Sequence, residues 1–365
     1  ASHSRRDFER IKRPDSARSV QPFSLGRRGR VASAAQRISV QRCRSSLRTL
    51  LVCVALAQLA VSPAAAEPAC EAFIKWRDAT GGSGACPRAL NTESARGLAL
   101  GTGVRATAMS TSALAYNPAG LVVGKVYHLE GVVDYLPDMK TVALGGAIVD
   151  SSTSRLAAGL SLRGFLSGQG GIGGIDGRLA LALPLSESIS IGLSGRYINA
   201  RRELPEPSVL DASGTQTLMP APKAVREVQG FTMDASIRVA PVPSVMLHAG
   251  SYNLISLDSV YAPLMVGGGA GIALGGVALL GADVLVDLNS CDKANVLVGG
   301  GAEVFAGQAV PLRAGYSYDT KRSQHTLSFG LGYTDRAVGL DISLRQDLGG
   351  EADTRIMGAF RFYVH

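Results

Sequence analysis

The feature of this sequence that most constrains its fold is an alternation of apolar and polar residues with a period of two. Between Ala278 and Asn289 one parity is aliphatic, whereas the other carries Asp283 and Asp287. Successive residues of a β-strand point to opposite faces, so this segment predicts a strand with one apolar and one polar face. The alternative, an apolar helix over Ala262–Ala282, is weakened by seven glycines. Two carboxylates on one face suit a water-filled lumen and not lipid.

The same alternation recurs along the chain and predicts 14 strands, each close to the 9–11 residues of a tilted transmembrane strand. Connections after even-numbered strands are mostly tight, whereas those after odd-numbered strands include the long segments Leu166–Gly173, Asn199–Arg226 and Ile255–Pro263. This asymmetry is typical of outer-membrane barrels, and a soluble sandwich has no reason to show it. We therefore expect an all-β, 14-stranded antiparallel transmembrane β-barrel. Its strands are expected at residues 125–135, 139–149, 154–166, 174–185, 187–199, 227–240, 244–254, 264–274, 276–288, 294–306, 309–319, 323–334, 336–347 and 353–364.

The formal net charge of +8 is unevenly distributed over the 365 residues. Residues 1–66 hold 13 Lys/Arg and 3 Asp/Glu, a net charge of +10, whereas residues 67–365 hold 24 and 26, a net charge of −2. The basic character therefore belongs to the first segment, and no nucleic-acid partner is expected for the rest. A charged fraction of 18%, below the roughly 25% of soluble domains, and 44 glycines favour a membrane protein without long apolar helices.

Residues 42–66 have the three parts of a secretory signal peptide. Three arginines precede the apolar run Leu50–Val61, and the small residues at 62–66 provide a cleavage site. The run is shorter than the roughly 20 residues that span a bilayer, which disfavours the alternative of a membrane anchor or buried helix. We expect a cleaved signal peptide and export to the bacterial outer membrane. Residues 1–41 are expected to be a basic, disordered pre-leader or an overlong gene start.

The exported part of the chain contains Cys70, Cys86 and Cys291. Export permits a disulfide, and we expect one between Cys70 and Cys86, with two unrelated thiols as the alternative. Such a bridge would contribute about 3 kcal/mol of stability on the chain-entropy model. Cys291 is left unpaired, and its spacing suits no metal site.

A stretch of small residues precedes the first expected strand. Pro118 disfavours helical geometry at Asn117, so a short helix is expected to end there. Gly120 then permits a sharp reversal into the first strand. The small residues allow this stretch to pack closely or to thread a confined space.

A Gly-x-Gly-x-x-Ala motif at residues 101–106 is followed by Ala115–Leu121, which ends in Asn-Pro-Ala-Gly-Leu. Phe231–Leu254 and Pro311–Tyr318 are two further characteristic stretches. Over residues 95–365 the sequence resembles the FadL/TodX-like outer-membrane transporters and their PorV-type relatives. The resemblance implies a barrel whose N-terminal segment folds into the lumen as a hatch. The expected organisation is the pre-leader (1–41), the signal peptide (42–66), a Cys-bracketed periplasmic segment (67–96), the hatch segment (97–121) and the barrel (122–365).

The resemblance leaves two functions open. In the transporter branch, a hydrophobic molecule is captured outside and released sideways through the wall as the hatch shifts. In the PorV branch, a non-conducting barrel serves protein secretion or surface attachment, and the loop Asn199–Arg226, with Pro205, Pro207, Pro220 and Pro222, would contact the partner. A general pore is a third alternative. We expect passive uptake of hydrophobic, long-chain fatty-acid-like molecules, with outer-membrane lipid and the ligand as partners.

Two groups of site residues follow from these expectations. The hatch and ligand group comprises Leu114, Tyr116, Asn117, Pro118, Ala119, Gly120 and Leu121. The lumen-facing charged group comprises Glu130, Arg163, Arg196, Asp234, Arg238, Asp283, Asp287, Arg313, Asp341 and Arg345.

Enzyme chemistry finds little support in the sequence. The glycine motif at 101–106 and a second one at 168–173 lack the βαβ context of a dinucleotide site. There is no nucleophile elbow, no His-Glu-x-x-His motif and no paired-cysteine metal spacing. Asp283 and Asp287, four residues apart on one strand face, are better explained as a solvated lumen wall than as an acid pair. We expect no catalytic residues, no metal and no cofactor.

Overall fold

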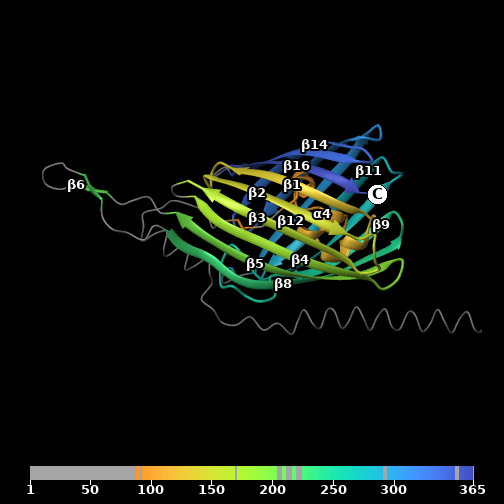
Figure 1. Ribbon diagram of the computed structural model, residues 1–365, viewed down its shortest axis with the longest axis horizontal. Coiled ribbons are helices and arrows are strands. Elements are labelled where there is room, and N and C mark those ends of the chain that lie inside the picture. The colour runs from red at the N-terminus through yellow and green to blue at the C-terminus, as the bar shows by residue number, and fades with distance from the viewer. Residues whose placement is uncertain are drawn as a thin grey trace, which may run out of the picture. The chain divides into compact units, whose positions relative to one another are not determined.

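The computed structural model describes residues 88–90, 93–168, 171–203, 208–210, 216–218, 224–290, 294–349 and 353–364 (Figure 1). The signal peptide, Cys70, Cys86 and Cys291 lie outside these residues, as do the four prolines of the long loop. The expectations for them therefore stay predictions.

Strands form at every position where the alternation predicts one. The wall strands are β1 (Tyr127–Leu136), β2 (Thr141–Asp150), β3 (Ala157–Ser167), β4 (Ile172–Pro184), β5 (Ile189–Glu203), β8 (Ala224–Val242), β9 (Val245–Tyr252), β10 (Met265–Leu274), β11 (Ala278–Asp287), β12 (Asn295–Ala306), β13 (Val310–Asp319), β14 (Gln324–Thr334), β15 (Val338–Leu348) and β16 (Thr354–Val364).

Within the described residues these strands form one closed antiparallel barrel. Each wall strand pairs with the wall strands that precede and follow it in the chain, and β1 pairs with both β2 and β16, which closes the ring. The predicted 14-stranded antiparallel barrel is confirmed. Closure matters because in lipid every backbone N–H and C=O must be paired within the protein, and a closed ladder leaves no open edge.

The two ends of the barrel differ in the length of their connections. At the end that carries the last residues of β16, β8 and β9 are joined by residues 243–244 and β10 and β11 by residues 275–277. At the other end, residues 253–264 join β9 to β10, and the connection from β5 to β8 contains a separate two-stranded sheet of β6 (Ser208–Leu210) and β7 (Gln216–Leu218). We refer to these as the turn end and the loop end. In Figure 1 the loop end is on the left.

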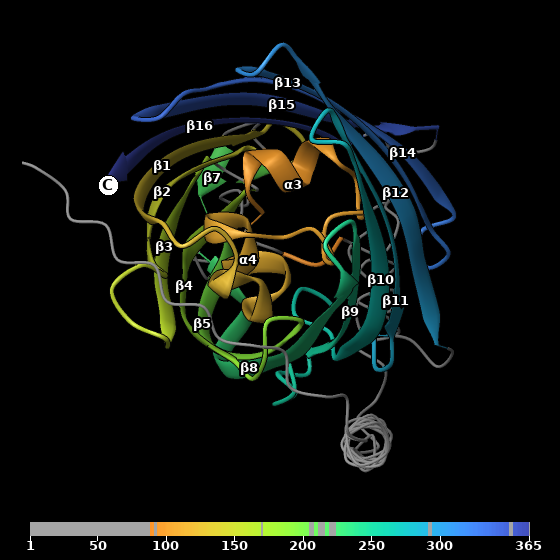
Figure 2. The ribbon, with the colours of Figure 1, turned by 90° about the vertical axis from the view of Figure 1, so that its right-hand side faces the viewer.

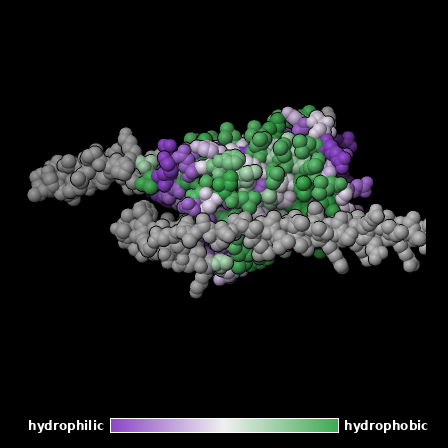
Figure 3. All heavy atoms as spheres, turned by 90° about the horizontal axis from the view of Figure 1, so that it is seen from below, coloured by the Kyte–Doolittle hydropathy of each residue, from purple (hydrophilic) through white to green (hydrophobic). Residues whose placement is uncertain are grey.

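The wall has an apolar outside and a polar inside, as the alternation predicts. On β1, Leu129, Val133 and Tyr135 are exposed, whereas Glu130 and Asp134 are buried. The outer surface shows an apolar band with hydrophilic residues toward its two ends (Figure 3). An apolar surface of this extent is not left in contact with water in soluble proteins but matches the lipid-facing band of a transmembrane barrel.

No helix among the described residues is long and apolar enough to cross a membrane.

Short helices lie inside the ring of strands (Figure 2). They are α3 (Ala95–Ala99), α4 (Ser110–Tyr116) and the 3₁₀ helix η1 (Pro118–Val122). Helix α3 packs against β13–β16, α4 against β2–β4, and η1 against β3–β5 and β8. The interior elements thus contact opposite sides of the wall.

The chain direction around Pro118 follows the sequence prediction, but the role of Gly120 differs. Helix α4 ends at Tyr116, directly before Asn117. Gly120 lies within η1 and does not have a positive φ. Its lack of a side chain is needed instead for close packing, because a Cβ atom there would overlap the carbonyl oxygen of Ala108.

Candidate functional site

The interior of the barrel is occupied by residues 93–123, which we call the lumenal segment. It begins with α3, where Ser94 caps the helix by accepting a hydrogen bond from the backbone N–H of Gly97 (3.1 Å). Turns follow over residues 100–107, and α4 and η1 lead the chain to the start of β1 at the turn end. Most of its residues are buried.

A glycine-rich wall lets the lumenal segment approach the barrel backbone directly. A Cβ atom at Gly281 would overlap the carbonyl oxygen of Gly103, and one at Gly301 or Gly315 would overlap the backbone of Leu100. Gly101 has a positive φ of 63°, which glycine adopts without strain. The Gly-x-Gly motif therefore serves a tight turn packed against β11–β13.

A carboxylate on the wall fixes this turn. The backbone N–H groups of Val104 and Arg105 donate to Oδ2 of Asp283 on β11, at 3.0 and 2.8 Å. The Arg105 guanidinium lies 3.5 Å from the same oxygen. Two backbone donors and one cation thus converge on one buried carboxylate, which makes Asp283 an attachment point for the segment.

Two tyrosines flank the Arg105 guanidinium. Its central carbon lies 5.5 Å from the ring centre of Tyr116 on α4 and 5.2 Å from that of Tyr252 on β9, distances typical of cation–π contacts. The Tyr252 hydroxyl donates to the carbonyl oxygen of Tyr116 at 2.7 Å. Burial raises the pKa of Tyr116, so its hydroxyl stays protonated. These contacts join α4 to the opposite wall.

The residues that the sequence assigns to the hatch lie together in α4 and η1. Leu114 and Leu121 belong to a buried apolar cluster that also contains Val149 of β2. The Asn117 side chain donates to the carbonyl oxygen of Arg105 at 2.9 Å, and the backbone N–H of Ala119 donates to Ser236 on β8 at 3.0 Å. All seven are buried: Leu114, Tyr116, Asn117, Pro118, Ala119, Gly120 and Leu121.

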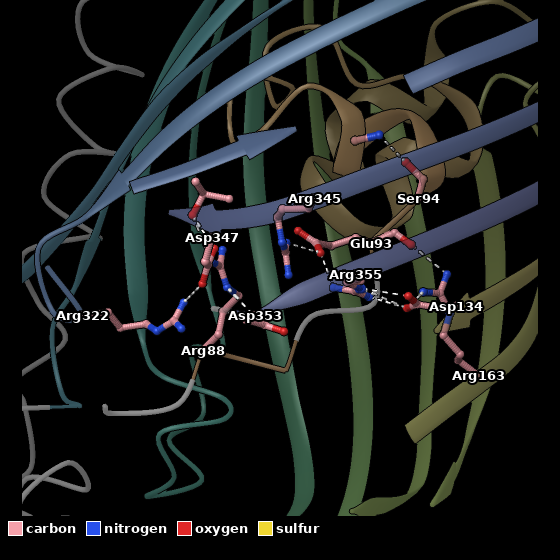
Figure 4. Close-up of polar contacts among 12 residues, drawn as sticks. Arg88, Glu93, Ser94, Asp134, Arg163, Arg322, Arg345, Asp347, Asp353 and Arg355 are labelled. Atoms are coloured by element: carbon pink, nitrogen blue, oxygen red, sulfur yellow. Dashed lines mark hydrogen bonds and ion pairs between the residues drawn. The ribbon is translucent and has the colours of Figure 1, made fainter. Parts of the chain in front are cut away.

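A cluster of charges holds the start of the lumenal segment (Figure 4). Glu93 lies between two arginines: Arg345 on β15 donates to Oε2 at 2.7 Å, and Arg355 on β16 donates to the same oxygen. Arg355 also binds Asp134 on β1 through its Nε at 2.9 Å. Burial opposes ionisation of Glu93, but Arg345, Arg355 and Arg88 outweigh it and lower its pKa from 4.5 to about 2.

A second cluster lies between α3 and the turn end. Arg96 on α3 donates to both oxygens of Glu303 on β12, at 3.0 and 3.3 Å. Arg313 on β13 binds Glu303 and Asp341, each at 2.5 Å. Arg361 pairs with Asp341 and lies 3.5 Å from Glu130. The charges of this cluster balance, so it presents no net charge.

A third cluster lies on β4, β5 and β8. Arg196, fully buried, pairs with Asp176 at 2.5 Å and donates to Asn253 at 3.2 Å. Arg178 pairs with Asp234 at 2.8 Å. Buried charges are tolerated when they are paired and hydrogen-bonded in this way.

The ten charged residues assigned to the lumen all lie on the inner parity of their strands. Nine are buried, and Arg238 is half-buried. The structure does not bring them together: most belong to the three clusters, whereas Asp283 binds the lumenal segment, Asp287 pairs with Lys321, and Arg238 lies in none of the clusters. Several partners were missed by the sequence analysis. Glu303 and Arg355 could have been found from strand parity, whereas Glu93 and Arg96 lie outside the strands, where the alternation gives no signal.

On one side of the loop end, over β2–β5 and β8, the inner surface of the barrel is apolar. Phe165 on β3, Ile172 on β4 and Ile198 on β5 are buried there, together with Leu90 and Tyr261. The β9–β10 loop folds over this surface, and Leu90 donates its backbone N–H to the carbonyl oxygen of Tyr261 at 2.8 Å. The chain itself therefore covers an apolar surface inside the barrel.

Cavities remain on both sides of the lumenal segment. One of about 70 Å³ lies toward the loop end, between Arg105, Tyr252 and Leu285. One of about 360 Å³ lies toward the turn end, beside Met109 and Phe305. The described residues contain no group of His, Cys, Asp and Glu side chains that could hold a metal ion.

A comparison with models of known protein families finds no match. A comparison with curated proteins finds none either. Among solved structures, the chain is similar to the toluene transporter TbuX of Ralstonia pickettii, with 12% identity, a TM-score of 0.55, and 76% of this chain and 99% of that chain covered. It is also similar to the toluene transporter TodX of Pseudomonas putida, with 12% identity, a TM-score of 0.53, and 76% and 99% covered. The chain thus has a FadL/TodX-like outer-membrane transporter fold.

Proposed function

From this fold and the apolar surface at the loop end, we propose that the protein is an outer-membrane channel for passive uptake of hydrophobic small molecules. The observation that carries the proposal is the apolar inner surface around Phe165, Ile172 and Ile198, inside a lumen whose walls also carry many ion pairs. A hydrophobic molecule that took the place of Leu90 and Tyr261 would gain about 25 cal/mol per Å² of apolar area removed from water.

The lumenal segment is the proposed hatch. This segment lies between the apolar surface at the loop end and the cavity of about 360 Å³ at the turn end. A ligand can therefore pass through the barrel only if the segment shifts. Its first part buries Leu98, Leu100 and Val104, but it also carries the charged contacts, to Arg345, Asp283 and Glu303, which water can replace. Its second part, α4 and η1, contains no charged side chain and is held by apolar burial and by hydrogen bonds such as that of Ala119 to Ser236. We therefore assign the movement to residues 93–107.

The ligand class rests partly on the structural relatives. TbuX and TodX are toluene transporters, and the apolar surface suits molecules of this kind as well as the apolar chains of fatty-acid-like molecules. Sideways release would need a break in the strand ladder. The ladder is irregular between Ala200 and Arg201 and between Val239 and Val242, on either side of β8.

Uptake by cells tests the proposal. Expression in the outer membrane of a host without a similar channel should increase the uptake of radiolabelled toluene and dodecanoate but not that of a small sugar. Phe165→Asn should reduce uptake of both hydrophobic compounds, because it places an amide in the apolar surface. A similar increase for the sugar would indicate a general pore. A stable protein partner without any uptake would instead support the secretion-scaffold alternative.

A further inference from the structure

A second large pocket opens at the turn end, next to η1. It has a volume of about 830 Å³ and lies between residues 151–155, residues 184–187 and the chain at 122–125, with Arg238 of β8 on its inner side. We call it the turn-end pocket. Its volume is within the range of about 300–1,000 Å³ that small-molecule sites have.

Arg238 is unlike the other described arginines of the lumen. Those each have a carboxylate partner, for example Arg196 with Asp176. Among the described residues Arg238 has neither an ion pair nor a hydrogen bond, and its Nε is buried without an acceptor. A buried donor that lacks an acceptor is unfavourable, and a guanidinium geometry matches a carboxylate or phosphate oxygen pair.

The charges around the pocket are mostly positive. Lys125 and Arg155 line it together with Arg238, and Glu187 is the one carboxylate among its lining residues. Asp150 lies nearby and accepts hydrogen bonds from the backbone N–H groups of the following turn at 3.0 Å, but with its charge included the three cations still outnumber two carboxylates. The pocket therefore carries an excess of positive charge.

Apolar side chains form the remainder of the lining. Val122 and Val123 come from the end of the lumenal segment, Ala157 and Ile189 from the starts of β3 and β5, and Pro184 from the end of β4. A free inorganic anion would make no favourable contact with these apolar groups. An anionic head joined to an apolar chain can use both the guanidinium and the apolar lining.

We propose that the turn-end pocket binds an amphiphile with one anionic head group, carboxylate or phosphate, and that Arg238 binds the head. The proposal rests on the proposed function, because it makes this pocket the site that a carboxylated ligand reaches after passing the hatch. A single-chain ligand and an anionic membrane lipid share the required chemistry, and competition separates them.

Equilibrium binding to the full chain in non-ionic detergent tests the site, with dodecanoate and uncharged dodecanol as probes. The protein should bind dodecanoate more tightly than dodecanol. Arg238→Gln should weaken dodecanoate binding by about ten- to a hundredfold, the effect of one hydrogen bond to a charged group, and leave dodecanol binding unchanged. Arg336→Gln, in another turn at the same end and outside the pocket, should change the binding of neither probe.

Competition separates the two sources of the ligand. Displacement of dodecanoate by short-chain phosphatidylglycerol assigns the site to a membrane lipid, and no displacement assigns it to a single-chain ligand.

Three results would overturn the proposal. If Arg238→Gln leaves the preference for dodecanoate intact, or if Arg336→Gln removes it equally, Arg238 does not bind the head group, while the proposed uptake of hydrophobic molecules stands. If neither probe binds, this proposal and the fatty-acid-like ligands of the proposed function fail together. A heat-modifiable gel shift of each variant verifies that the barrel is folded.

Discussion

Arg105 and Asp283 are joined twice through one carboxylate oxygen. The backbone N–H of Arg105 donates to Asp283 Oδ2 at 2.8 Å, and its guanidinium Nη1 lies 3.5 Å from the same atom. The two residues are far apart in the sequence, in a turn of the lumenal segment and in β11. Their contact fixes the position of the segment relative to the wall, and it is the contact that a moving hatch would have to release.

Asp283→Asn should therefore loosen the lumenal segment without opening the barrel. The amide keeps an acceptor but loses the charge, so we expect local opening of residues 97–107 to become easier by about 1–3 kcal/mol. Hydrogen exchange of the backbone amides in this range measures the effect. Asp287→Asn is the matched control, because Asp287 lies on the same face of β11 but pairs with Lys321 in the β13–β14 turn and not with the lumenal segment. Equal loss of protection in both variants would contradict the assignment.

The lowered pKa of Glu93 predicts that the folded protein loses stability at acidic pH. Its pKa is about 2 in the folded protein and 4.5 as the ordinary value, so the folded state favours the ionised form. The stabilisation, about 3 kcal/mol from the size of the shift, is complete above pH 4.5 and is lost as the pH falls toward 2. Thermal unfolding in detergent at pH 6 and pH 3 measures it. Glu93→Gln should lower the unfolding midpoint at pH 6 and reduce the difference between the midpoints at pH 6 and pH 3. If the variant keeps the same difference between the midpoints, Glu93 does not have this role.

The glycine-rich wall predicts a strong position dependence of glycine substitutions. Gly281→Ala places a Cβ against the carbonyl oxygen of Gly103 and should destabilise the protein by about 1–3 kcal/mol, the usual effect of overpacking. Gly131→Ala on β1 meets nothing within 4 Å and serves as the control. Denaturant unfolding and proteolysis of the lumenal segment compare the two variants. Equal effects would mean that the segment does not press on the wall at Gly103.

If the outer face of the barrel contacts lipid, a charged residue introduced there should destabilise the protein. The side chain of Leu162, near the middle of β3, is 60% exposed on this face. Leu162→Arg should destabilise the barrel in a bilayer by about 2–4 kcal/mol, whereas Val277→Arg in the β10–β11 turn should have little effect, because the turn reaches the interface. Folding yields in liposomes measure both. Full folding of Leu162→Arg would argue against a membrane-embedded band.

The strands, their number and their inner and outer faces follow from the sequence alone. Residues such as Leu129 and Glu130 alternate on β1 because the strand geometry itself alternates, and closure follows because an open edge is unfavourable in lipid. The short helix that ends before Asn117 follows as well, because proline restricts its neighbour locally.

The contacts inside the barrel could be identified only from the tertiary structure. The lumenal segment has no strand period, so its partners could not be read from a pattern: Glu93 meets Arg345 and Arg355, and Val104 and Arg105 meet Asp283, only because the closed ring brings distant residues to one place. The same holds for Gly120, whose role is set by the carbonyl of Ala108, and for Arg238, whose parity predicts that it faces the lumen but not that it lacks a partner there. Local geometry depends on neighbours along the chain and is written in the sequence, whereas the contacts of the lumenal segment depend on which parts of the closed wall surround it.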